Sequence, residues 1–229
     1  MTEINIYSVP MALFDFLPVI FFAVSAVLMQ RDCYNKMPKY AFACLAAGCV
    51  NGFLAGFFKA LWKLLYALEL CDFEVLNKMF LPVQSLGLLL TGLGLILMLT
   101  NRREIRLLAV PPVFAGTFVF ITMMVTGLGM MCAALSVVAV KMKKAWLIAV
   151  FILTFFCYMA MGYLASAADT ALMNWIEQSV NLLGQLLLLL GVWTLHKAGL
   201  RQSASSLTYD ASFLILSAPS GSSSLARAR

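Results

Sequence analysis

Polar side chains that interrupt long apolar stretches are the residues of this sequence most able to do chemistry. Seven of them are candidates for binding a ligand: Asp15, Asn51, Lys59, Gln84, Glu177, Asn181 and Gln185. Carboxylates and an ammonium can hold opposite charges on a ligand, and amides, which both donate and accept hydrogen bonds, suit hydroxylated, amide or zwitterionic solutes. A charge at the centre of a membrane helix costs roughly 2.5–3.5 kcal/mol, so each one requires a reason.

The spacing of these residues predicts that the charged ones share one depth in a membrane. Asp15, Lys59 and Glu177 each lie about five to seven residues from the centre of an apolar stretch, which is ~8–10 Å at ~1.5 Å per residue. Opposite charges at one depth neutralise each other only if they face the interior of a bundle. We therefore expect Lys59 and Glu177 to face each other at the mouth of a polar cavity, with the amides as its floor.

Structural explanations stay open for the same residues. Lys59 and Glu177 could form an ion pair that only holds two helices together. Lys63 is close enough to the predicted interface for its ammonium to reach the headgroups, and we expect it to do so. Asp15 lies at the headgroups if the first span starts later. For the lone amides, hydrogen bonding between helices is the more common role.

The composition requires that most of the chain be solvated by lipid. Of the 229 residues, 63% are hydrophobic and 11% are charged, against ~45–50% and ~25% in soluble domains. Mean hydropathy is +0.95. A soluble fold could not bury this much apolar surface, so we predict an all-α, multi-pass membrane protein. The net charge of +6 arises from basic residues in short loops and does not indicate nucleic-acid binding.

Seven apolar segments are predicted to span the membrane: 11–30, 40–66, 79–100, 107–125, 130–140, 145–165 and 171–196. Gly127 and Gly129 are expected to break the chain between the fourth and the fifth. Because the fifth segment is short, these two could instead form one long helix pair or a re-entrant hairpin. Residues 1–201 would form the bundle, and the Ser/Ala-rich residues 202–229 are predicted to be a flexible tail.

Basic and acidic residues alternate from loop to loop. Eleven bases fall in loops one, three and five and after the last segment: Arg31, Lys36, Lys39, Arg102, Arg103, Arg106, Lys141, Lys143, Lys144, Lys197 and Arg201. The N-terminus and the other loops carry Glu3, Glu69, Asp72, Glu74 and Asp169, with Lys78 as the one clear base. The positive-inside rule then predicts an outside N-terminus, a cytoplasmic C-terminus and residence in the cell membrane.

Two segments of the chain share a sequence pattern. Gln84-Ser85-Leu86-Gly87 with Gly94 matches Asn181-Leu182-Leu183-Gly184 with Gly191 at a constant offset. We predict two parallel three-helix units, 11–100 and 130–199, joined by the helix 107–125. This 3+1+3 layout resembles the SWEET and PQ-loop transporters, and its helix number and orientation resemble the seven-helix rhodopsins. The Pro-Gln pairs of the former and the retinal-binding lysine of the latter are missing, so the resemblance covers layout alone.

The leading functional hypothesis is a passive or ion-coupled carrier of a small polar solute. The alternative is a receptor or accessory protein that binds a ligand or partner, and a weaker one is a membrane-embedded lipid-modifying enzyme. Motifs for metal, nucleotide or serine-hydrolase chemistry are missing, so we expect no cofactor and no nucleic-acid partner. Gly48, Gly52 and Gly56 form a small-residue stripe that favours helix packing and could also support a homo-oligomer.

Overall fold

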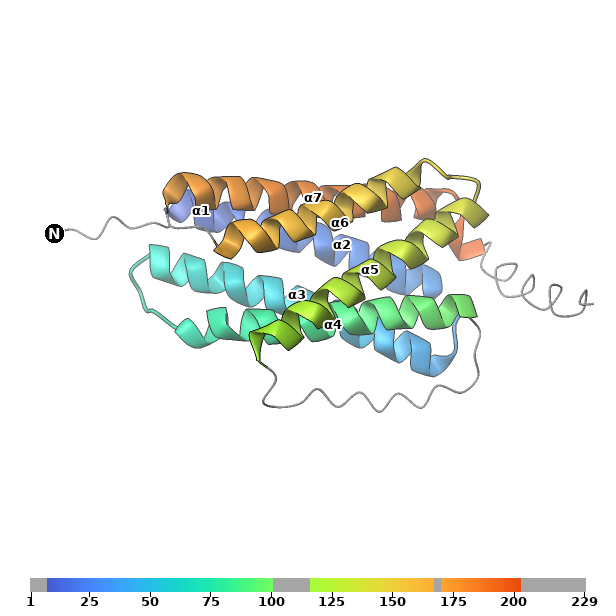
Figure 1. The fold of residues 1–229 in the computed structure, drawn as a ribbon, viewed down its shortest axis with the longest axis horizontal. Helices are drawn as coiled ribbons and strands as arrows, with labels where there is room; N and C mark the ends of the chain where they lie inside the picture. Colours follow the sequence, from blue (N-terminus) through green and yellow to red (C-terminus); the bar gives the residue numbers. More distant parts are fainter. Residues whose placement is uncertain (1–7, 101–115, 167–169, 203–229) are drawn as a thin grey trace, which may run out of the picture.

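The computed structural model describes residues 8–100, 116–166 and 170–202, where every regular element is a helix (Figure 1). The helices are α1 (Val9–Phe14), α2 (Phe16–Cys33), α3 (Lys39–Ala67), α4 (Glu74–Thr100), α5 (Thr117–Lys141), α6 (Leu147–Ser166) and α7 (Ala171–Lys197). Within these described ranges, six candidate spans are long and apolar enough to cross a membrane, and α1 and α2 together form the first. The predicted all-α class is confirmed for the described residues.

The predicted break at Gly127 and Gly129 is wrong. Helix α5 runs through both glycines from Thr117 to Lys141. A Cβ atom added to Gly127 would overlap backbone atoms of Leu88 and Leu89 in α4. This glycine therefore allows two helices to approach closely, which is a common use of glycine in membrane helices. The predicted segment 107–125 lies partly, and the predicted tail almost entirely, outside the described residues.

Contacts between the helices fix their directions. Gly48 of α3 faces Thr91 of α4, and Gly94 faces Leu45, so α3 and α4 are antiparallel. Gly184 of α7 faces Cys157 of α6, and Gly191 faces Phe151, so α6 and α7 are also antiparallel. Helices α2 and α7 are parallel. The ring of Phe14, two residues before α2 begins, contacts Trp175 in the first half of α7, and Asp32 and His196 meet near the ends of the two helices.

Helices α4 and α5 therefore run in the same direction, although they are consecutive in the described chain. The end of α4 and the start of α5 lie at opposite ends of the bundle (Figure 1). The short turn between α5 and α6 lies at the same end as the end of α4.

Helix packing is repeated between two halves of the bundle. Helix α3 packs on α4 as α6 packs on α7, and α2 packs on α7 as α5 packs on α4. The aligned glycines have matching surroundings: Gly87 and Gly94 face α3, whereas Gly184 and Gly191 face α6. Each of these glycines thus faces the helix that precedes its own in the chain.

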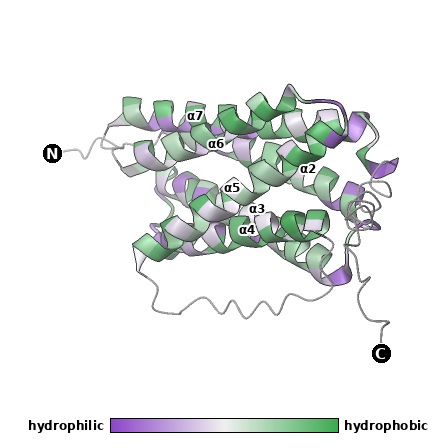
Figure 2. Cartoon of the chain, turned by 45° about the vertical axis from the view of Figure 1, so that its right-hand side comes forward, coloured by the Kyte–Doolittle hydropathy of each residue, from purple (hydrophilic) through white to green (hydrophobic). Residues whose placement is uncertain are grey.

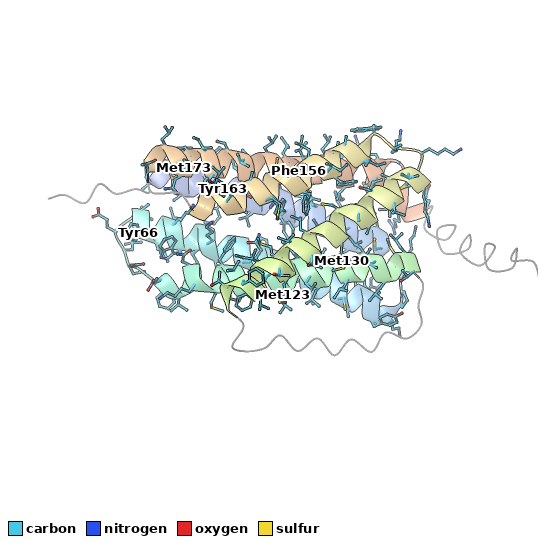
Figure 3. The ribbon with its side chains drawn as sticks, viewed as in Figure 1. Tyr66, Met123, Met130, Phe156, Tyr163 and Met173 are labelled. Atoms are coloured by element: carbon cyan, nitrogen blue, oxygen red, sulfur yellow. The ribbon has the colours of Figure 1, made fainter. Side chains whose placement is uncertain are left out.

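Charged residues gather at the two ends of the bundle, and the surface between them is apolar (Figure 2). We call one end the basic end; it carries Arg31, Lys36, Lys39, Lys141, Lys143, Lys144, Lys197 and Arg201. The other, the acidic end, carries Glu69, Asp72 and Glu74 together with Lys78. Large apolar side chains project outward between the ends, among them Phe156 and Tyr163, which are 61% and 75% exposed (Figure 3). Such a surface is suited to contact with lipid tails.

Candidate functional site

Asp15 lies at the break between α1 and α2. Pro18 lacks the amide hydrogen that would bond to the carbonyl of Phe14, and its ring crowds that carbonyl, so the helix is interrupted there. The side chain at the break is buried, since Asp15 is 6% exposed. Asp15 therefore faces the other helices and not the headgroups.

Lys63 departs from its predicted place. The sequence predicts that its ammonium reaches the headgroups, but the residue is 1% exposed and its Nζ lies 2.9 Å from Oδ2 of Asp15. A buried carboxylate without a counter-ion is strongly destabilising, and pairing with a lysine at short range offsets that penalty. Lys63 is thus the counter-ion of Asp15, and the prediction for Lys63 is wrong.

The predicted pairing of Lys59 with Glu177 is confirmed. Nζ of Lys59 donates a hydrogen bond to Oε1 of Glu177 at 3.1 Å, with the two side chains 18% and 4% exposed. The ammonium also lies 4.6 Å from the ring centre of Phe80, a cation–π contact with α4. Lys59 therefore connects α3 to both α7 and α4.

The two ion pairs form one compact set, the four-charge cluster of Asp15, Lys59, Lys63 and Glu177. Asp15 interacts electrostatically with Lys59 and Glu177 as well as with Lys63. Two carboxylates and two ammoniums give a formal charge of zero. Buried charges inside a membrane protein are tolerated in such mutually neutralising sets.

Two small adjoining cavities lie beside the four-charge cluster, each of about 40 Å³. The cluster cavity is lined by Asp15, Val19, Gly56, Lys59, Ala60, Phe80, Met161, Gln178 and Asn181. The amide cavity is lined by Pro18, Val19, Phe22, Gly52, Phe53, Gly56, Asn181 and Gln185. Each has room for a few water molecules, at ~10–15 Å³ each, but is far smaller than the ~300 Å³ of a typical ligand pocket.

The structure brings most of the predicted site residues together. Asp15, Lys59, Asn181 and Gln185 line the cavities, and Glu177 joins them through its bond to Lys59. Asn51 and Gln84 line neither cavity. Oε1 of Gln84 is nevertheless buried without a hydrogen-bond partner.

Gln178 is a cavity residue that the sequence analysis missed. It is 2% exposed and lines the cluster cavity. The sequence does contain a pattern that indicates this role. Gln178, Asn181 and Gln185 follow one another at i, i+3 and i+7, which places them on one face of a helix.

A hydrogen-bonded pair of side chains joins α2 and α7 at the basic end. Nδ1 of His196 lies 3.0 Å and 2.9 Å from the two carboxylate oxygens of Asp32, whose side chain is fully buried. Next to it, Nζ of Lys36 donates to the carbonyl of Leu200 at 2.8 Å. Partial burial, which removes water from the ammonium, lowers the pKa of Lys36. The ends of α2 and α7 are therefore held together by polar side chains.

The small-residue stripe of α3 is a packing seam inside the chain. A Cβ added to Gly48 would overlap Thr91 and Gly87 of α4, and one added to Gly52 would lie 2.8 Å from the ring of Phe22. A Cβ on Gly56 would lie 3.2 Å from Val19. The predicted role in helix packing is confirmed. Self-association of the protein stays a prediction and would need another surface.

Comparison of the chain with protein-family models, curated proteins and solved structures finds no match. No match therefore supports the predicted likeness to SWEET and PQ-loop transporters, and the geometry of the site is the basis for a functional proposal.

Proposed function

We propose that this protein is a carrier that moves a small polar solute across a membrane through the site beside the four-charge cluster. One observation carries the proposal. Four charged side chains form two ion pairs among apolar helices, and two of them, Asp15 and Lys59, line the cluster cavity together with the amides of Gln178 and Asn181. Apolar side chains would pack a bundle at lower cost, and ionisable residues within membrane helices usually mark solute or ion pathways.

The repeated packing of the helices supports the same proposal. We propose that α2–α4 and α5–α7 are two parallel three-helix units. The second unit would begin at Thr117 and not at residue 130 as in the predicted repeat 11–100 and 130–199, because α5 includes part of the predicted joining helix 107–125. Parallel repeats about an axis along the membrane normal occur in transporters, whose substrate sites lie between the repeats. Here α2 and α3 of one unit and α6 and α7 of the other supply most residues around the cavities.

We further propose that the chain crosses the cell membrane seven times, with its N-terminus outside and the basic end of the bundle in the cytoplasm. Helices α4 and α5 are parallel, so a seventh crossing between them would give every helix the direction that the charge pattern requires. The gathering of eight basic residues at one end of the described bundle supports this orientation.

Transport requires a conformation other than the one described, because the cavities hold only a few water molecules. The four-charge cluster connects α1–α2, α3 and α7, so these helices can separate only if at least one ion pair is broken or exchanged. A solute that replaces one partner of a pair would compensate for that loss. The cluster would then couple solute binding to opening of the bundle.

Uptake into proteoliposomes tests the proposal. Purified protein would be assayed with labelled glycine, glucose, glycerol and urea, and we expect saturable uptake of at least one of them. The double variant Lys59→Met/Glu177→Gln should abolish this uptake. The exposed pair Glu74–Lys78, with side chains 60% and 69% exposed, supplies the control variant Glu74→Gln/Lys78→Met, which should transport normally. Failure of the folded wild-type protein to transport any solute of the panel would overturn the proposal.

The second candidate is a receptor or accessory protein, and the small size of the cavities favours it. A bundle that only signals or supports a partner does not need a solute-sized path. Saturable binding of a ligand without uptake would assign the protein to this class.

A further inference from the structure

We infer that the cluster cavity binds a compact zwitterion, an α-amino acid of about the size of glycine. Its carboxylate would lie at Lys59 and its ammonium at Asp15. The inference rests on the proposed function, because it names the class of solute for the same site.

Charge balance selects a zwitterion over ions of either sign. The four-charge cluster is neutral as a set, and it is surrounded by apolar helices. A net anion or a net cation would add one charge that no side chain of the cluster compensates, which is heavily penalised in such surroundings. A zwitterion brings one charge of each sign and leaves the sum at zero.

Asp15 offers the acceptor for an ammonium. Its Oδ2 is held by Lys63 at 2.9 Å, which fixes the carboxylate. Its Oδ1 is buried, has no hydrogen-bond partner, and belongs to a side chain that is 5% exposed and lines the cluster cavity. Buried carboxylate oxygens are nearly always hydrogen-bonded. An ammonium carries three donors and can satisfy this oxygen.

Lys59 offers the donor for a carboxylate. Its ammonium has three hydrogens, and Glu177 accepts one hydrogen bond from it. The amides of Gln178 and Asn181 line the same cavity and can donate to a second carboxylate oxygen. The cavity is thus lined by a cation and neutral donors, which can bind a carboxylate, and by an anion, which can bind an ammonium.

The walls of the cavity limit the size of the ligand. Val19, Ala60, Phe80 and Met161 are apolar, and the volume of about 40 Å³ is that of a few water molecules. The cavity must therefore widen slightly to hold glycine, and would have to widen further for a longer side chain. We therefore expect glycine to bind more tightly than amino acids with long side chains.

Binding of glycine to purified protein in lipid nanodiscs tests the inference. Glycolate lacks the ammonium, methylamine lacks the carboxylate, and glycerol lacks both charges. We expect calorimetry to show saturable binding of glycine. The dissociation constant of each of the other three probes should be at least ~10-fold higher. Equal binding of glycolate or methylamine would overturn the inference.

Variants locate the site. Asp15→Asn alone leaves Lys63 without its counter-ion and risks misfolding, so the neutral double variant Asp15→Asn/Lys63→Met is the informative one. It should fold, as judged by its melting temperature, and lose glycine binding at least ~10-fold. Normal glycine binding by this folded double variant would overturn the assignment to Asp15. The control variant Glu74→Gln/Lys78→Met should bind glycine as the wild type does.

Parallel uptake measurements separate this inference from the proposed function. Glycine binding without uptake would keep the zwitterion site and reject the carrier. Uptake of glucose, glycerol or urea without glycine binding would keep the carrier and reject the zwitterion. The loss of both signals in a folded protein would reject both.

Discussion

Lys59→Met is expected to destabilise the protein more than Glu177→Gln, although both changes remove the same ion pair. In Lys59→Met, the carboxylate of Glu177 stays 4% exposed and loses its hydrogen-bond donor. Breaking a buried pair in this way costs about 3–5 kcal/mol. In Glu177→Gln, Lys59 keeps its contact with Phe80 at 4.6 Å and the field of Asp15. A desolvated cation–π contact contributes ~2 kcal/mol, so we expect about half of the loss seen in Lys59→Met.

The double variant should recover most of this loss, because no unpaired charge is left. We expect the free energy of unfolding of Lys59→Met/Glu177→Gln to lie within about 1–2 kcal/mol of the wild-type value. The coupling energy between the two positions is then several kcal/mol. Reversible unfolding in mixed micelles, followed by tryptophan fluorescence, measures all four proteins. In the control pair Glu74–Lys78, each single change should cost no more than ~0.5 kcal/mol. Simple additivity of the two losses at positions 59 and 177 would refute the reasoning.

Three other features of the bundle give predictions. Gly127→Ala should lower the free energy of unfolding by about 1–3 kcal/mol, because the new methyl group overlaps the backbone of α4. The control is Gly162→Ala, whose new methyl group has no neighbour within 4 Å; it should be neutral or slightly stabilising in the same unfolding assay. Equal effects of the two variants would contradict the close packing at Gly127. His196→Leu should cost about 1.5–3 kcal/mol, since it leaves a fully buried carboxylate without its hydrogen-bond donor, and a fully stable variant would show that this contact does not hold the two helices together. Thiol labelling tests the placement of the two ends in a protein from which the other cysteines have been removed. A membrane-impermeant reagent should label exposed Cys71 from one side of the membrane and the Lys143→Cys variant from the opposite side. Labelling of both positions from the same side would disprove the opposite placement of the acidic and basic ends.

The membrane helices could be predicted from the sequence because hydropathy alone reports them. The predicted segment 40–66 became Lys39–Ala67, and 171–196 became Ala171–Lys197. The break at Gly127 failed for a physical reason. Glycine is compatible both with a turn and with close helix packing, and only the position of α4 decides between them.

The candidate site, too, could be predicted from the sequence only in part. Lys59 and Glu177 could be paired from the sequence, because equal depth and opposite charge leave few other partners. The prediction that the ammonium of Lys63 reaches the headgroups was wrong, because the depth of a residue does not show whether a counter-ion faces it. Asp15, at the helix break next to Pro18, is that counter-ion. Asp32 and His196, 164 residues apart, could not be paired without knowing that α2 and α7 are neighbours.

Counterflow of labelled glycine in proteoliposomes tests the central claim most directly. Vesicles loaded with unlabelled glycine should transiently accumulate the label when they contain the wild-type protein. Those containing folded Lys59→Met/Glu177→Gln should not. Equal accumulation by this variant and the wild type would contradict the claim that solute passes through the four-charge cluster. The absence of counterflow for glycine, glucose, glycerol and urea with folded wild-type protein would contradict the claim that the protein is a carrier.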